Sequence, residues 1–263
     1  MFALLPTEKG NAVVTETRGR VRVEDAPKRV RTYLGGELVA DTVRAKLVWE
    51  VPYYPAYYIP EEDVRTELLT PTDRREHSPS RGEAHYFNVK SGRRVAPDAA
   101  WTYPESPLSE LLGLVRFDWE AMDAWFEEDE EVYVHPRDPY TRVDILPSSR
   151  HLEVVVNGVK VADTHQPRLL FETKLPTRYY VPLVDVRLDL LHPSSTTTRC
   201  PYKGTASYWS VEAGDQVVED LAWIYRTPVQ ESMRIAGLAC FYNEKVDLYV
   251  DGELLEQPHT KFS

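Results

Sequence analysis

The feature that most constrains this chain is an internal repeat, in which the second half resembles the first at a fixed offset. Residues 39–42 (VADT) reappear as residues 161–164, and the positions of Asp41 and Asp163 give an offset of 122. Further identical pairs keep that offset without a gap: Gly36 and Gly158, Glu50 and Glu172, Tyr58 and Tyr180, Pro60 and Pro182, Gly82 and Gly204, Tyr86 and Tyr208, and Trp101 and Trp223. A two-residue shift then aligns Phe117 with Phe241. One register held over this length indicates two copies of a domain of about 110 residues.

The repeat divides the chain into three predicted segments. Residues 1–28 form an N-terminal extension that adds a strand to the first unit, residues 29–146 form the first copy, and residues 147–263 form the second copy. The boundary falls at the turn-forming run Pro147-Ser148-Ser149. A length of 263 residues suits this division, since a domain usually contains roughly 100–200 residues.

Each copy is predicted to consist mainly of β-strands. Residues 152–156 and 159–162 are rich in valine and flank Asn157-Gly158, a dipeptide that tolerates the positive φ angles of a two-residue hairpin turn. The corresponding turn of the first copy is Gly35-Gly36. Many short strands joined by such turns favour a compact β domain.

A second hairpin and a short helix complete the pattern of each unit. In the second copy, residues 246–250 and 254–255 flank Asp251-Gly252. The segments 107–115 and 228–238 each begin with a proline, which suits the first turn of a helix, and each has room for about three turns. The predicted fold class is therefore mainly β, with two tandem domains of twisted antiparallel sheets and one short helix in each.

The charge and hydropathy of the chain exclude several classes of partner. The chain has 31 basic and 42 acidic residues, and its net charge of −11 repels nucleic-acid phosphates and anionic membrane surfaces. No apolar run approaches the roughly 18 residues of a membrane span, and the first residues (MFALLP) lack a basic leader. We therefore predict a cytoplasmic protein that binds neither nucleic acid nor membrane.

The cysteine content and the absence of common motifs predict no metal and no cofactor. Cys200 and Cys240 are the only cysteines, so one chain cannot build a thiolate-rich zinc site or a disulfide framework. The seven histidines are scattered, and the sequence lacks a P-loop, a dinucleotide fingerprint and a G-x-S-x-G nucleophile motif. These absences argue against common kinase, dehydrogenase and hydrolase mechanisms.

Three motifs of the second copy resemble those of the DUF427 family. They are residues 178–182 (RYYVP), 200–208 (CPYKGTASY) and 222–225 (AWIY), and residues 135–140 (HPRDPY) with 148–151 (SSRH) are similar to the lead-in of such a domain. The resemblance covers nearly the whole chain as two tandem copies. It implies a β-tent fold, shared with methionine sulfoxide reductase B and the thalidomide-binding domain of cereblon. Those relatives bind zinc through four cysteines that this chain lacks, and the family's nucleotidyltransferase-like label has no matching phosphate loop or aspartate pair here.

Cys200 is the candidate catalytic residue, as a nucleophile or redox thiol. Lys203 and Arg199 lie close in sequence and are able to stabilise its thiolate. The first copy has Ser78 at the equivalent position, so only the second copy carries this thiol. The alternative is a buried, inert cysteine, which is also the role predicted for Cys240.

Aromatic and cationic residues of the second copy form a candidate binding site. The predicted ligand-binding residues are Arg178, Tyr180, Lys203, Tyr208, Trp223, Tyr225 and Arg226. Aromatic walls bind flat or cationic ligands, and converging cations bind carboxylates or phosphates. We expect Tyr208 and Trp223 to be the most exposed, because they flank the turn of the CPYKG motif. Core packing of the aromatics and ion pairing of the cations are the alternatives.

Three functional hypotheses follow. The first is a small-molecule-binding module whose anionic or aromatic ligand lies in the second copy, with the first copy degenerate and structural. The second is an enzyme that uses Cys200. The third is a structural or protein-interaction scaffold, which predicts no enclosed pocket in either copy. The tandem pair suggests a monomer whose two domains replace a homodimer of single-copy relatives.

Overall fold

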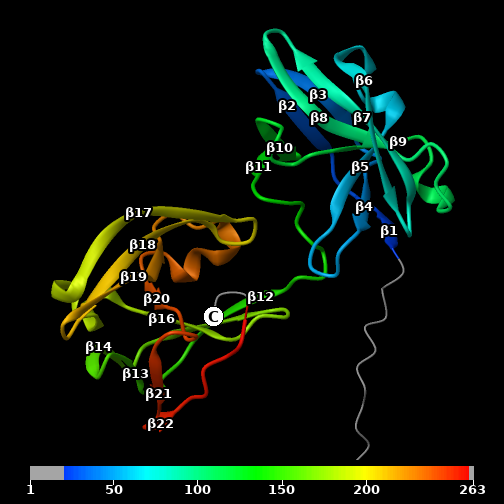
Figure 1. The fold of residues 1–263 in the computed structure, drawn as a ribbon. Helices are drawn as coiled ribbons and strands as arrows, with labels where there is room; N and C mark the ends of the chain where they lie inside the picture. Colours follow the sequence, from blue (N-terminus) through cyan, green and yellow to red (C-terminus); the bar gives the residue numbers. More distant parts are fainter. Residues whose placement is uncertain (1–20, 261–263) are drawn as a thin grey trace, which may run out of the picture.

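The structure, a computed structural model, describes residues 21–260, and the two copies contain the same succession of strands (Figure 1). The strands of the first copy are β1 (Arg22–Asp25), β2 (Val30–Leu34), β3 (Glu37–Thr42), β4 (Lys46–Trp49), β5 (Ala56–Pro60), β6 (Leu69–Ser78), β7 (Gly82–Ser91), β8 (Arg94–Thr102), β9 (Leu114–Phe117), β10 (Ala124–Glu127) and β11 (Glu130–Val132). Those of the second copy are β12 (Val143–Pro147), β13 (Leu152–Val156), β14 (Val159–Thr164), β15 (Arg168–Glu172), β16 (Arg178–Val181), β17 (Leu191–Cys200), β18 (Gly204–Ala213), β19 (Gln216–Tyr225), β20 (Ala239–Phe241), β21 (Asp247–Val250) and β22 (Glu253–Leu254).

Each copy consists of a seven-stranded and a four-stranded antiparallel sheet. The first copy has the strand orders β1-β4-β5-β9-β8-β7-β6 and β11-β10-β2-β3, and the second copy repeats them as β12-β15-β16-β20-β19-β18-β17 and β22-β21-β13-β14. The irregularities repeat as well: the register shift between Pro71 and Arg75 recurs between Pro193 and Thr197, 122 residues later. The prediction of two tandem antiparallel β domains is confirmed.

The two-residue turns fold as the sequence predicts. Asn157 and Gly158 have φ angles of 48° and 78°, and Gly35 and Gly36 have φ angles of 61° and 77°. Positive φ at both turn positions matches the twist of the flanking strands, so β2–β3 and β13–β14 are tight hairpins. The terminal hairpin β21–β22 turns at Asp251-Gly252 in the same way.

The helical segments are shorter than predicted. The structure has 3-10 helices η1 (Glu61–Asp63), η2 (Thr66–Leu68) and η3 (Ser109–Leu111) in the first copy, and η4 (Leu183–Asp185), η5 (Leu188–Leu190) and η6 (Gln230–Ile235) in the second. The predicted three-turn helices at 107–115 and 228–238 are therefore wrong in length. After η6, the backbone N–H of Gly237 donates to the carbonyl of Tyr225 on β19 at 2.9 Å, which draws the chain back to the sheet.

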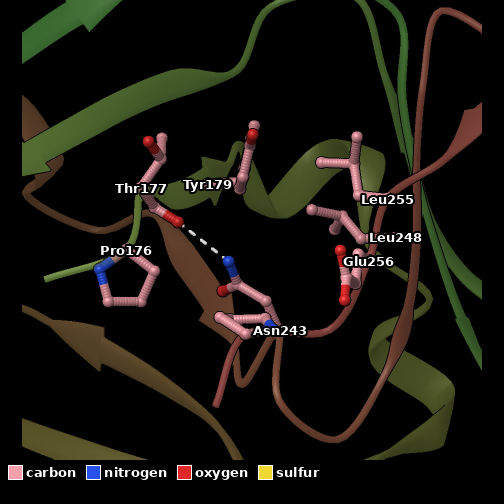
Figure 2. Close-up of a pocket in the computed structure, with 8 residues that line it drawn as sticks. Pro176, Thr177, Tyr179, Asn243, Leu248, Leu255 and Glu256 are labelled. Carbon is pink, nitrogen blue, oxygen red and sulfur yellow. Dashed lines mark hydrogen bonds between the residues drawn. The ribbon is translucent and has the colours of Figure 1, made fainter. Parts of the chain in front are cut away.

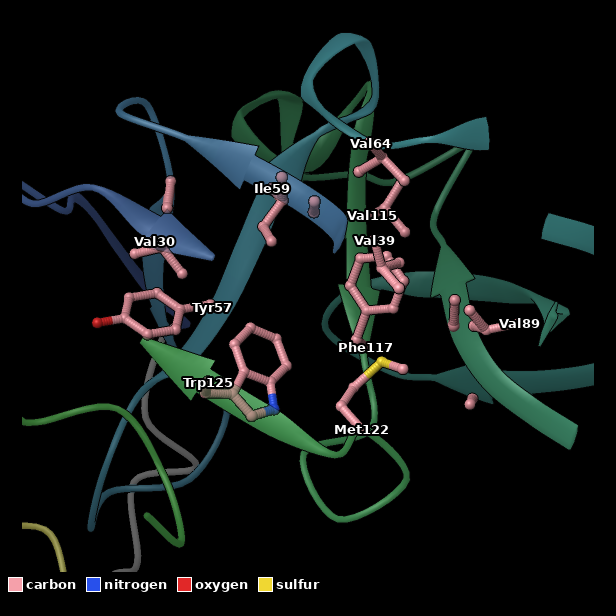
Figure 3. Packing of buried hydrophobic residues seen from close by; sticks show 14 of the residues in the cluster. Val30, Val39, Tyr57, Ile59, Val64, Val89, Val115, Phe117, Met122 and Trp125 are labelled. Carbon is pink, nitrogen blue, oxygen red and sulfur yellow. The ribbon is translucent and has the colours of Figure 1, made fainter. Parts of the chain in front are cut away.

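The main core of each copy lies between its two sheets. In the first copy, Val30 of β2 lies near Tyr57 and Ile59 of β5, with Trp125 of β10 beside them (Figure 3). Leu34 of β2 belongs to the same cluster. All five residues are less than 5% exposed. The removal of such apolar side chains from water is the principal stabilising contribution to a domain of this kind.

The segment between the copies contributes to the second sheet. β12 pairs with β15 and is the counterpart of β1, which pairs with β4. The second copy's sheet therefore begins before residue 147, and the described part of the predicted N-terminal extension contributes strand β1. Residues 1–20 of that extension lie outside the described residues. Across residues 21–260, no helix has the length and apolar character needed to span a membrane.

Replacement of Leu221 by alanine should lower the free energy of unfolding by about 2–5 kcal/mol, because this fully buried side chain would leave a cavity. The matched control is Leu188→Ala, where the side chain is 49% exposed and the expected change is within about 0.5 kcal/mol. Urea denaturation measures both. Equal losses in the two variants would contradict this assignment of the core.

Candidate functional site

The repeated aromatic residues gather on one face of each seven-stranded sheet. Successive side chains of a strand point to opposite faces. Tyr57 packs in the core between the sheets, so Tyr58 lies on the outer face, within a separate cluster that also contains Tyr86 and Tyr103. The equivalent cluster of the second copy contains Tyr180, Tyr208, Trp223 and Tyr225. The duplication therefore preserves a second apolar cluster, outside the main core.

Six of the seven predicted binding residues of the second copy are buried in or beside this cluster. Tyr180 and Tyr225 are 1% and 5% exposed, Tyr208 and Trp223 are 7% exposed, and Arg178 and Lys203 are also buried. Arg226 is exposed and does not join them. The predicted aromatic set is thus a spatial cluster, while the three predicted cations do not form one patch.

The expectation that Tyr208 and Trp223 are exposed is wrong, because both rings pack within the cluster, with the ring of Tyr242 beside them. The ring of Tyr242 lies 4.6 Å from that of Trp223 and 6.5 Å from that of Tyr208, measured between centroids. The Tyr208 and Tyr242 hydroxyls also form a 3.3 Å hydrogen bond. Tyr242 follows β20 directly, where the repeat has just shifted by two residues.

The guanidinium of Arg178 is fully engaged by an acidic partner. It donates to both carboxylate oxygens of Glu244, at 2.6 and 2.7 Å, and to the amide oxygen of Asn243 at 2.9 Å. It also lies 5.6 Å from the ring of Trp223 and 5.8 Å from the ring of Tyr242, measured to the ring centroids. Burial opposes the charge of Glu244, but the hydrogen bonds from Arg178 and Thr260 outweigh it and lower the carboxyl pKa.

Lys203 is paired with Glu172 beside the candidate catalytic thiol. Their side chains form a salt bridge and are only 11% and 8% exposed. Burial opposes the charge of Lys203, but the nearby side chains of Cys200 and Glu172 outweigh it and raise the lysine pKa. Arg199, the other predicted partner of the thiol, lies over the ring of Tyr133 instead. Cys240 is fully buried, as predicted, and burial raises the pKa of its thiol to about 12.

The first copy has the same carboxylate but a different set of cations. Glu50, the counterpart of Glu172, accepts a hydrogen bond from the hydroxyl of Tyr58 and lies 3.1 Å from Nε of Arg116. Arg81, the counterpart of Lys203, approaches the same carboxylate only to 4.0 Å, and its Nε donates to the Tyr103 hydroxyl at 3.1 Å. Arg116 lies over the ring of Trp101 at 4.2 Å, so it occupies the place that Arg178 has near Trp223.

A cavity of 390 Å³ opens over this site of the first copy. It is lined by Glu50, Glu76, His77, Ser78, Pro79, Arg81, Tyr86, Trp101 and Tyr103. The residue that follows β9 is Asp118, and its backbone N–H donates to Ala99 as that of Tyr242 donates to Leu221. An aspartate therefore stands where the second copy has this tyrosine. The sequence-based hypothesis missed this cavity, although the motif residues that line it are counterparts of the predicted ones.

Comparison with known families identifies the repeated unit. Two segments, residues 22–128 and 144–252, match the family described as a domain of unknown function (DUF427). The chain belongs to the DUF427 family. The two matches agree with the tandem duplication, and a search of curated proteins returned no match to this chain.

The lead-in motif of the second DUF427 copy packs against its CPYKG turn. Nε of Arg137 donates to the carbonyl of Pro201 at 3.0 Å, and the backbone N–H of Asp138 donates to the hydroxyl of Tyr202 at 2.7 Å. The ring of His135 lies edge-on to that of Tyr202. The segment between the DUF427 copies thus holds the turn that carries Cys200 and Lys203.

A smaller cavity of 180 Å³ lies near the end of the second DUF427 copy (Figure 2). It is lined by Pro176, Thr177, Tyr179, Asn243, Leu248, Leu255, Glu256 and Pro258. The amide of Asn243 donates to the carbonyl of Thr177 at 2.8 Å across its wall. The predicted binding residues are absent from this lining, and its charged group is a single exposed glutamate, so it is the weaker candidate.

A third group, His151, Glu153 and Asp163, has its possible ligand atoms within 4.8 Å of one another. The ammonium of Lys160 forms ion pairs with both carboxylates, and Nε2 of His151 lies 2.7 Å from Asp163. These contacts satisfy the carboxylates within the protein. The group is a surface ion-pair network in which Lys160 supplies the counter-charge.

The buried pair Arg178–Glu244 predicts a specific acid sensitivity. The pKa of Glu244 lies below its ordinary value of 4.5 in the folded state, so the pair stabilises the fold above that pH and is lost as the pH falls through the lowered value. Glu244→Gln should cost about 3 kcal/mol at pH 7, because it removes the negative charge opposite a buried guanidinium. The cost should shrink below pH 4.5 in urea titrations at several pH values. A cost independent of pH would contradict the ionised pair.

Proposed function

We propose that this protein is a small-molecule-binding module and that its ligand occupies the cavity of the first DUF427 copy. The observation that carries the proposal is the 390 Å³ cavity bounded by Trp101, Tyr86 and Arg81. Ligand sites of proteins typically enclose about 300–1,000 Å³ and combine aromatic walls with a few charged groups. The volume of this cavity falls within that range, and its lining combines three aromatic residues with several polar and charged groups.

The proposal moves the ligand from the second copy to the first. In the second copy, Arg178 and Lys203 are held by Glu244 and Glu172, and the Tyr242 ring lies over Trp223. A ligand there would have to displace a buried salt bridge or a packed ring, and either change is costly. In the first copy Trp101 is half-buried and lines the cavity, while Tyr86 and Tyr103 are as buried as their counterparts. The opening beside Trp101 favours the first copy as the binding copy.

A thermal-shift screen of metabolites and nucleotides on the intact chain tests the proposal. A ligand at a hundredfold excess over its Kd should stabilise the folded form by about 2.7 kcal/mol. The shift should be lost in Trp101→Ala, which removes a wall of the cavity, and kept in the matched variant Trp223→Ala. Loss of the thermal shift in Trp223→Ala alone would indicate that the ligand binds in the second copy. The absence of any stabilising compound would favour the scaffold hypothesis.

Thiol chemistry at Cys200 is the second candidate function, favoured by the contact between its side chain and the buried ammonium of Lys203. An ammonium stabilises a thiolate, which is the nucleophilic form of cysteine. The half-exposed position of Cys200 gives a reagent access that the buried Cys240 lacks.

Labelling with iodoacetamide from pH 5 to pH 9, followed by peptide mass mapping, should modify Cys200 and leave Cys240 unmodified in the folded protein. The enzyme hypothesis requires Cys200 to react faster at pH 6 than a free thiol does, and Lys203→Met to remove that advantage. A Cys200 that follows the rate profile of a free thiol would eliminate this function. Melting temperatures of the variant serve as the control for folding.

A further inference from the structure

The carboxylates that line the first-copy cavity already have cationic partners. Glu76 accepts from Arg74, whose Nε lies 3.1 Å away, and from the Tyr86 hydroxyl at 2.8 Å. Glu50 is paired with Arg116 and accepts from Tyr58. Neither carboxylate is therefore a strong site for a cationic ligand, because such a ligand would compete with an existing ion pair.

The positive charge of Arg81 has a more distant partner. Its closest carboxylate oxygen, on Glu50, is 4.0 Å away and is closer to Arg116. Among residues 21–260, the side-chain hydrogen bond of Arg81 runs from Nε to the Tyr103 hydroxyl, which leaves the outer edge of the guanidinium without an acceptor. The side chain is nevertheless only 18% exposed. Arg81 and Arg116 thus share the carboxylate of Glu50, while Glu76, the other carboxylate of the cavity, is paired with Arg74.

Two buried donors of the same site also have no acceptor within the described chain. They are Nε1 of Trp101 and Nε of Arg116, and the Arg116–Glu50 ion pair does not have hydrogen-bond geometry. The second copy satisfies its equivalent tryptophan, because Nε1 of Trp223 donates to the Tyr180 hydroxyl. Buried donors without acceptors are costly, so the interior of this site is less well satisfied than that of the second copy.

We infer that the ligand of the first-copy cavity carries a compact anionic group, a carboxylate or a phosphate, which binds the free edge of Arg81. Its ring or apolar body lies against Tyr86 and Trp101. A planar guanidinium offers two parallel donors to such a group, which adds geometric selectivity to the charge. The inference rests on the proposed function and assigns the chemistry of its ligand.

Isothermal titration of the full-length protein with five probes tests the inference: benzoate, phenyl phosphate, inorganic phosphate, benzamide and benzylammonium. Benzoate or phenyl phosphate should bind at least about tenfold more tightly than benzamide, since a charge-assisted bidentate contact is worth about that factor or more. The tighter of the two identifies the anionic group. Comparison of phenyl phosphate with inorganic phosphate measures the contribution of the ring.

Two variants assign the contact to Arg81. Arg81→Gln should weaken the anionic probe about tenfold and leave benzamide unchanged, while Arg81→Lys, which keeps the charge but loses the planar fork, should weaken it less. The matched control is Arg226→Gln, which removes an exposed arginine of the second copy and should change neither affinity. Melting temperatures of all three establish that they fold.

Two results would overturn the inference. Tighter binding of benzamide or benzylammonium, with affinity lost in Trp101→Ala but not in Arg81→Gln, would retain the cavity as a binding site and reject the anionic ligand. An anionic probe whose affinity is lost in Arg226→Gln would place its site in the second copy. If no aromatic probe of any charge binds and the metabolite screen is silent, the proposed function itself fails.

Discussion

The seven-stranded sheet of each copy buries side chains on both of its faces, and most of the structure depends on this constraint. One face meets the four-stranded sheet, as Tyr57 and Ile59 do in the first copy. The other face carries Tyr58 and its aromatic neighbours. Polar groups on a face that is largely withdrawn from water need partners, since a buried charge without one is costly. This requirement explains why a glutamate and a cation recur together at the edge of both clusters.

Much of the fold follows from the sequence because the signals that specify it are local. The repeat at an offset of 122 and the turns at Gly35-Gly36 and Asn157-Gly158 predict two copies of the same hairpin-rich domain. The length of the helices was not predictable in this way. A proline start and a glycine end suit an α-helix, but η6 ends at Ile235, and the bond from Gly237 to Tyr225 that returns the chain to the sheet belongs to the tertiary structure.

The candidate site was predictable only in part. The recurrence of Tyr208 and Trp223 as Tyr86 and Trp101 correctly indicates a shared cluster. Whether that cluster is open depends on Tyr242, which has no counterpart aromatic, because Asp118 follows β9. Asp118 and Tyr242 lie after the point where the register of the repeat shifts. A search for residues that recur will therefore find the common framework and miss the residues that make one copy differ from the other.

The exchange of cations between the copies shows how the framework permits that difference. In the first copy the residue beside the tryptophan is Arg116 on β9, which pairs with Tyr58 on β5, and the equivalent pair of the second copy is Cys240 and Tyr180. The second copy supplies its cation from β16 instead, where Arg178 replaces Ala56 of the first copy. The guanidinium therefore comes from β9 in the first copy and from β16 in the second. The equivalent position on the other of these two strands holds Ala56 in the first copy and Cys240 in the second.

The consequence of this exchange lies in the anion that accompanies each cation. In the second copy Arg178 forms an ion pair with Glu244, and Glu172 forms a separate ion pair with Lys203. In the first copy Arg116 pairs with Glu50, at 3.1 Å. Arg81, the counterpart of Lys203, lies farther from the same carboxylate, at 4.0 Å. The change of strand for the arginine thus accompanies a change in ion pairing: Lys203 pairs closely with Glu172, whereas Arg81 lies 4.0 Å from Glu50 and lines a cavity.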